Sequence, residues 1–171
     1  NTNNWDTGQV PSPVSIVKIN STANQPEIGE SDNVEVASLE LEPTAEVKVF
    51  GVLKVGSRII NNGQITFKST ATKTGQFDEF TGTYSGTGTV EVERFIPVQT
   101  EDTRAFRFVT SSVNSNGSIY DYWQEGGNSP AGFGTHITGN NDGSNGVDQT
   151  TTGNPSMYTF DNSFTGNQSN A

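Results

Sequence analysis

The sequence predicts an all-β protein: a short β-solenoid segment, similar to a parallel β-helix, followed by a β-sandwich or jelly-roll-like domain. Aliphatic residues recur every six positions between Leu41 and Ile65, as expected of stacked coils. No stretch repeats apolar residues at the 3.6-residue interval of an amphipathic helix. The chain has 19 glycines and no leucine after Leu53, a composition typical of strands and turns.

The N-terminal region contains one alternating apolar run, Val14–Ile19, between turn-rich flanks with prolines. Such a run predicts a strand. We expect Trp5 and this strand to cap one end of the apolar core. Cap and coils together form the first predicted unit, a solenoid-like stalk over residues 1–97.

The six-residue interval comprises five aliphatic residues: Leu41, Val47, Leu53, Ile59 and Ile65. Further apolar residues follow two positions later at Val49, Val55 and Phe67. Short strands place each such pair on one face, because side chains alternate along a strand. Stacked coils would bury these faces as one continuous column. A meander of short antiparallel strands is the alternative, and the interval does not fix the handedness of a solenoid.

Further strands are expected before the end of the first unit. Residues 68–89 read as strands joined by turns of small residues. Val90–Ile96 then alternates cleanly, which predicts a half-buried strand with a polar outer face. The polar segment after Pro97 predicts a domain boundary.

Residues 98–171 form the second predicted unit, a β-sandwich-like domain that is incomplete or packed on the first. Alternation predicts strands at Arg104–Val109 and Met157–Phe160. Between them, a stretch from Gly126 to Gly153 is rich in glycine, asparagine and serine. Long loops of this kind suit a β-sandwich with a loop-built face.

The charge of the chain excludes some partners. Its formal net charge is −10, from 9 basic and 19 acidic residues. Such a chain repels nucleic acid and anionic membranes, so we expect no nucleic-acid partner and no direct membrane insertion. A solvated acidic surface accounts for the carboxylates, and binding of a divalent cation is the alternative.

The absence of cysteine excludes disulfides, thiolate metal sites and cysteine nucleophiles. The chain begins at Asn1 without a methionine, a signal peptide or a transmembrane run. We therefore expect Asn1 to be a mature or excised end.

Several phrases, in chain order, resemble the large cell-surface proteins of Bacteroidetes and flavobacteria that are exported by type IX secretion. They are Asn4–Pro11, Ile60–Ser69, Gly88–Pro97, Arg104–Ser112, Tyr122–Glu125, Gly132–Gly139 and Asn154–Asp161. The resemblance implies an adhesin-like extracellular protein with a β-solenoid stalk and a β-sandwich. It implies no defined activity. The C-terminal sorting domain of such proteins has no counterpart among these residues, so the mode of attachment to the cell does not follow.

One loop offers oxygen ligands for a metal. Calcium binds about six to eight hard oxygens, and residues 139–148 are rich in aspartate, asparagine and glycine. The candidate ligands are Asn140, Asp142, Ser144 and Asp148. A solvated turn is the alternative, since the spacing differs from that of the helix-flanked calcium loop. We therefore expect no required cofactor, and calcium is the candidate ligand of this loop.

The aromatic residues Tyr120, Tyr122 and Trp123 are candidates for carbohydrate binding, because aromatic faces stack on sugar rings. If this segment is a strand, alternation separates Trp123 from the two tyrosines. Core packing is then the alternative role for at least one face.

No set of residues predicts catalysis. His136 is the only histidine, whereas a zinc site or a catalytic triad needs further partners. Carboxylate pairs for glycoside hydrolysis could be drawn from Glu101, Asp102, Asp121 and Glu125. Any acidic chain offers such pairs, so we expect no enzyme.

These observations favour a non-catalytic structural or adhesive segment of a secreted protein at the bacterial cell surface. Exposed strand edges suggest neighbouring modules or copies of the same protein as partners, with surface glycans as further ligands. A carbohydrate-binding module, with or without calcium, is the first alternative. An accessory domain of a polysaccharide-degrading enzyme is the second.

Overall fold

The computed structural model describes residues 5–96, 108–124, 137–138, 155–158 and 163 of the 171-residue chain. The chain divides into two compact units, Asn1–Asn114 and Ser115–Ala171. The predicted boundary after Pro97 falls beside residues 97–107, which lie outside the described residues, and it stays a prediction.

The regular secondary structure of the described residues is almost entirely β, as the sequence predicts. The strands are β1 (Ile16–Ile19), β2 (Glu27–Ile28), β3 (Asn33–Leu41), β4 (Glu46–Val49), β5 (Val52–Asn61), β6 (Gln64–Phe67), β7 (Gln76–Phe77), β8 (Thr83–Ser85) and β9 (Thr89–Val92). The one helical element among these residues is the single turn α1 (Ile119–Tyr122).

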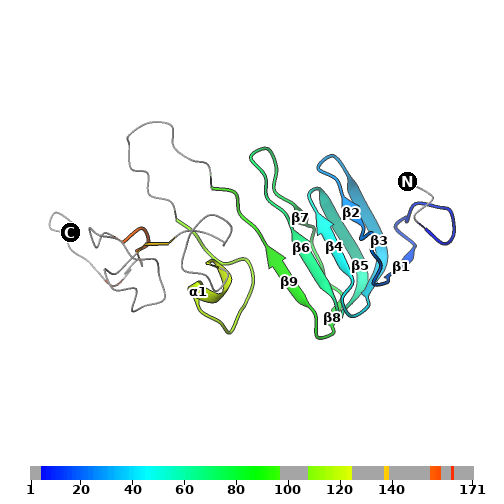
Figure 1. The fold of residues 1–171 in the computed structure, drawn as a ribbon. Helices are drawn as coiled ribbons and strands as arrows, with labels where there is room; N and C mark the ends of the chain where they lie inside the picture. The colour runs from blue at the N-terminus through cyan, green and yellow to red at the C-terminus, as the bar shows by residue number, and fades with distance from the viewer. Residues whose placement is uncertain (1–4, 97–107, 125–136, 139–154, 159–162, 164–171) are drawn as a thin grey trace. The chain divides into compact units, whose positions relative to one another are not determined.

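The strands form two sheets in which each named pairing is parallel. One sheet has the order β1-β3-β5-β7, with β8 also paired to β5, and the other has the order β2-β4-β6-β9. Figure 1 shows the strands of successive coils lying side by side. Parallel neighbours that are one coil apart in sequence define a β-solenoid and contradict the antiparallel meander.

The pairing divides the solenoid into successive coils. We number them in chain order: coil 1 (16–32), coil 2 (33–51), coil 3 (52–75) and coil 4 (76–93). Each coil contributes to both sheets, so the apolar side chains of both sheets meet in the space that the coils enclose.

The six-residue interval is the spacing between short runs within one coil. The register between β3 and β5 shifts at residues 36–38, and residues 56–58 in the middle of β5 are exposed. β7 and β8 then pair separately with the two halves of β5. Leu53, Ile59 and Ile65 each lie on a different run of coil 3, at the six-residue interval.

Three such runs complete a coil and bring the chain back to the same position. Val47 of coil 2 pairs with Ile65 of coil 3, which is three intervals further along the chain. Ile65 in turn pairs with Val90 of coil 4, which is a longer step. The extra length comes from an insertion at residues 68–75, between β6 and β7.

The predicted core residues are buried. None of the five residues of the six-residue series is more than 3 % exposed. The three that follow two positions later, Val49, Val55 and Phe67, are buried as well. Since a buried aliphatic side chain contributes about 1.5–3 kcal/mol, this column is a major source of the stability of the solenoid.

Some strands are shorter than the alternation predicts. β1 begins at Ile16 rather than at Val14, which is 85 % exposed. β9 ends at Val92 rather than at Ile96. The segment around Tyr120, considered as a strand, is a helical turn with Ser118 as its N-cap and Asp121 completing a capping box.

The β-sandwich predicted for residues 98–171 is not shown. Within the described residues, Thr138 and Ser156 exchange two hydrogen bonds, at 2.9 and 3.0 Å, and Ile137 is buried. The described residues of the predicted strands at 104–109 and 157–160 are not in strands.

Candidate functional site

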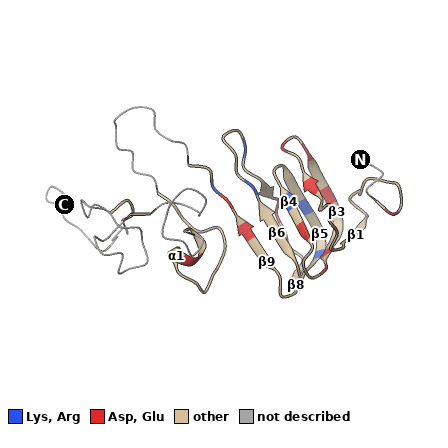
Figure 2. Cartoon of the chain, in the orientation of Figure 1, with Lys and Arg blue, Asp and Glu red and all other residues tan. Residues whose placement is uncertain are grey.

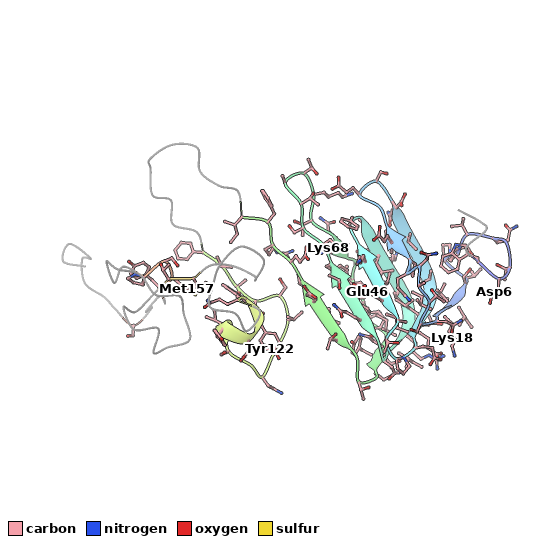
Figure 3. All side chains as sticks on the ribbon, in the orientation of Figure 1. Asp6, Lys18, Glu46, Lys68, Tyr122 and Met157 are labelled. Carbon is pink, nitrogen blue, oxygen red and sulfur yellow. The ribbon has the colours of Figure 1, made fainter. Side chains whose placement is uncertain are left out.

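All five lysines of the chain bind a residue of another coil. The ion pairs between coils are Lys18–Glu40, Lys18–Glu42, Lys48–Glu27, Lys54–Glu35 and Lys68–Glu93. Lys73 donates a hydrogen bond to the backbone carbonyl of Glu30. Figure 2 shows basic and acidic positions on adjacent strands, and Lys18 and Lys68 are labelled in Figure 3. Exposed pairs stabilise little individually, but their order along the stack favours one register.

The ion pair between Lys68 and Glu93 is the least exposed of these pairs. Glu93 accepts hydrogen bonds from the Lys68 ammonium and from the backbone N–H of Ser69. The hydrogen bond with Glu93 raises the pKa of Lys68 above its ordinary value, against the opposing effect of burial. Lys68 is therefore held in its charged form next to the last strand.

The insertion at residues 68–75 reaches from coil 3 to coil 1. The hydroxyl groups of Thr70 and Thr72 donate hydrogen bonds to the Glu30 carboxylate, at 2.9 and 3.2 Å. At its base, the Ser69 hydroxyl accepts a hydrogen bond from the Phe95 N–H at 2.8 Å. The insertion thus connects the first coil with the segment that follows the last.

Glycines occupy corners where successive coils approach closely. A Cβ atom on Gly51 would lie 2.2 Å from the carbonyl oxygen of Asp32 and 2.3 Å from that of Gly29. A Cβ on Gly63 would lie 2.1 Å from the carbonyl oxygen of Ala45. Both sites exclude any side chain, because the obstructing atoms belong to the backbone.

Asn61 replaces an aliphatic residue in the buried column, and its polar atoms all find partners. Its amide nitrogen donates to the Tyr84 hydroxyl at 3.1 Å and to the Thr89 carbonyl at 2.9 Å. Its amide oxygen accepts from the Gly63 N–H at 3.1 Å. Asn61 therefore ties a corner of coil 3 to coil 4.

Trp5 covers the first coil, as the sequence predicts. Trp5 packs against the core cluster, and its segment lies beside β1 in Figure 1. The inward residues Val17, Ile19 and Ile28 of coil 1 are each only 7 % exposed. The side chain of Ile16, which faces outward, is 76 % exposed.

The last coil is open. Tyr84 is 50 % exposed, whereas Ile59, its partner on the preceding coil, is 2 % exposed. Phe77 is 41 % exposed, whereas its partner Leu53 is 2 % exposed. The aromatic rings of this end pack on one another, with the Phe77 and Phe80 centroids 5.7 Å apart. The apolar column therefore ends in a surface of exposed aromatic side chains.

The backbone of the last coil also faces outward. The N–H groups of Thr89 and Glu93 bind carbonyls of coil 3, both at 2.9 Å. Since peptide groups alternate in direction along a strand, the N–H and C=O groups of Val90 and Val92 point away from coil 3. No named strand pairs with this outer edge among residues 5–96 and 108–124.

Acidic side chains border this open end. Asp78, Glu79 and Glu91 are exposed, and Glu93 is half-buried. Glu91 accepts a hydrogen bond from the Gln64 amide at 2.9 Å, and its neighbour Glu93 is tied to Lys68. We call the edge of β9, the exposed side chains of Phe77 and Tyr84, and these carboxylates the open end.

The aromatic residues considered for carbohydrate binding lie in the helical turn α1 and at its C-cap, Trp123. In the helical turn α1, Tyr120 and Tyr122 no longer share a face, whereas Tyr120 and Trp123 are three residues apart. Tyr122 is 56 % exposed and its ring lies so close to Gly117 that a Cβ there would be 2.3 Å away. Figure 3 labels Tyr122.

The predicted calcium ligands Asn140, Asp142, Ser144 and Asp148 lie outside the described residues, as does His136. The described residues contain no group of three or more histidine or acidic side chains that could hold a metal. Of the carboxylates considered for hydrolysis, Asp121 is described. Hydrogen bonds from Ser118 lower the pKa of Asp121, which fits its role in the capping box.

The open end was missed by sequence reasoning, which predicted exposed edges without saying which. The signal available was the change of residue type along one inward column, from Val17, Leu39 and Ile59 to Tyr84. The steps between its members differ in length, and this unequal spacing hides the column until the register is known.

No helical run among the described residues has the length and hydrophobicity needed to cross a bilayer. Comparisons of the chain with protein-family models, with curated proteins and with solved structures gave no match.

Proposed function

We propose that this chain is a non-catalytic structural segment of a secreted bacterial cell-surface protein, with the solenoid as a spacer that joins neighbouring modules. The observation that carries the proposal is the use of all five lysines to connect coils. The lysines of the solenoid thus stabilise the stacking of its coils. The carboxylates that have no lysine partner leave the sides of the solenoid negatively charged.

The remaining features of the solenoid agree with a spacer. Glycine corners set a close distance between coils, and Asn61 is fully bonded in the column. Each coil contacts mainly the next coil. Such a stack separates the modules at its two ends and does not enclose a ligand. The extracellular location rests on the resemblance of the sequence to type IX-secreted surface proteins.

A replacement experiment tests the proposal. In cells that display the protein, coils 1 to 3 (residues 16–75) are deleted or are replaced by the same number of coils from an unrelated solenoid, and coil 4 is kept in both variants. A spacer predicts that deletion lowers cell adhesion and that the foreign solenoid restores it. A foreign solenoid that fails to restore adhesion would show that the surface chemistry of these coils matters, against the proposal.

The carbohydrate-binding alternative is tested on the second unit. On a glycan array, the spacer proposal expects no signal for the chain and none for Trp123→Ala. A glycan signal that Trp123→Ala abolishes would instead support a carbohydrate-binding module. A melting temperature that falls on addition of a chelator would indicate the calcium-dependent form of that alternative.

A further inference from the structure

We infer that the open end is a docking site for an extended polypeptide segment in which apolar residues alternate with lysine or arginine. The segment would add to β9 as the next strand of the second sheet. This inference rests on the proposed function and deepens it, since it names the chemistry of the neighbouring module that joins this end.

The backbone supplies the first argument. Val90 and Val92 present their N–H and C=O groups to the outer edge, because Thr89 and Glu93 direct theirs toward coil 3. An added strand satisfies these groups with main-chain hydrogen bonds, as in other cases of β-augmentation.

The apolar columns supply the second argument. Along the column that ends at Val92, the preceding residues Ile28, Val49 and Phe67 are 7, 0 and 7 % exposed. Val92 itself is half-buried, and Tyr84 ends its own column 50 % exposed. Aliphatic or aromatic side chains on alternate positions of the docked strand would continue these columns.

The charges supply the third argument. Wherever two charged side chains pair across coils in the described register, one is a lysine and the other a glutamate: Lys18 with Glu40, Glu27 with Lys48, and Glu35 with Lys54. The last coil presents Glu91 on the outward face of β9 and Glu93 directly after the end of that strand. Lysine or arginine beside these carboxylates on the next strand would repeat the Lys–Glu pairs of the earlier coils.

A second copy of this chain, stacked head to tail, does not meet these requirements. The first coil carries its own cover at Trp5. In register, Glu27 of that coil occupies the position of Glu91, so stacking would oppose two carboxylates. A distinct segment with basic residues fits the open end better.

Isothermal titration of the full chain with a synthetic peptide tests the inference. The probe is acetyl-Thr-Val-Lys-Val-Lys-Val-Thr-amide at low salt, and the matched control has glutamate for both lysines. We expect the control to bind about tenfold or more weakly, since two attractive pairs become repulsive. Backbone N-methylation provides a second readout: methyl groups on one alternate set of residues should abolish binding, and on the other set should not.

Two substitutions locate the site. Glu91→Lys should reverse the preference between the two peptides, whereas Glu27→Lys on the first coil should leave it unchanged. Val90→Pro should abolish binding without breaking a hydrogen bond to coil 3, and retained circular dichroism shows that the variant is folded.

Several results would overturn the inference. The first two are equal binding of the basic and acidic peptides and equal effects of both N-methylated sets. The third is no binding at all, the result expected if a segment of this chain already covers the edge. Self-association of the chain through this end, seen by light scattering and abolished by Val90→Pro, would assign the edge to a second copy instead. None of these results alters the outcome of the solenoid replacement, so this inference and the proposed function fail separately.

Discussion

Gly51 illustrates how single residues set the distance between coils. An alanine there would press its Cβ against two backbone carbonyl oxygens at 2.2 and 2.3 Å, so coils 1 and 2 would have to separate. We expect Gly51→Ala to lower the free energy of unfolding by about 1–3 kcal/mol, as overpacking does. Chemical denaturation measures the loss.

Gly56 is the matched control for this prediction. It lies in β5, and a Cβ there would meet its nearest atom at an ordinary 3.6 Å. Because glycine weakens a strand, Gly56→Ala should leave the stability unchanged or raise it slightly. Equal losses in the two variants would show that the corners are less crowded than their geometry implies.

Asn61 is a polar residue in an otherwise apolar column, and its hydrogen bonds hold coils 3 and 4 together. Asn61→Ala would remove the hydrogen bonds to the Gly63 N–H and the Thr89 carbonyl, each of which contributes about 1 kcal/mol to stability. The neighbouring Asn62→Ala removes only a 3.3 Å hydrogen bond from the Thr87 N–H. Thermal unfolding should therefore separate the two variants clearly, and similar melting temperatures would contradict the role given to Asn61.

At the scale of the element, the ion pair of Lys68 with Glu93 joins the end of β6 to the end of β9. The pKa of Lys68 is raised above its ordinary value of 10.5. The stability that it contributes is therefore complete below pH 10.5 and is lost as the pH rises through the pKa of the folded state. We expect the melting temperature to decline above pH 10.5.

Lys68→Arg separates this loss from other alkaline effects. An arginine stays charged in this range, so the variant should decline less steeply above pH 10.5 than the original chain. Identical pH profiles for the two proteins would show that the pair adds nothing measurable.

The same scale shows what the sequence could predict. The inward positions were visible because Leu41 to Ile65 recur at one interval within the coils. The coil length was not, because the insertion at 68–75 lengthens one step, and its ties to Glu30 connect segments far apart in the chain. The turn at Ile119–Tyr122 was missed because its capping pair, Ser118 and Asp121, is a local signal that an expectation of strands obscured.

For the whole solenoid, the two ends differ, and unfolding should begin at the open one. Coils that contact mainly their neighbours can open one by one from an end. Trp5 covers coil 1, whereas Phe77 and Tyr84 of coil 4 are 41 and 50 % exposed. We therefore expect the amides of Thr89 and Glu93, bonded between coils 3 and 4, to exchange with solvent hydrogen faster than those of Glu42 and Phe50, bonded between coils 1 and 2.

Removing the cover should change one end alone. Trp5→Ala is expected to speed exchange at Glu42 and Phe50 while leaving Thr89 and Glu93 unchanged, and Val10→Ala, at a residue 55 % exposed, should affect neither pair. Hydrogen exchange followed by nuclear magnetic resonance measures all four amides at once. If they exchange with one common free energy, the solenoid unfolds as a single unit, and the difference between its covered and open ends has no energetic counterpart.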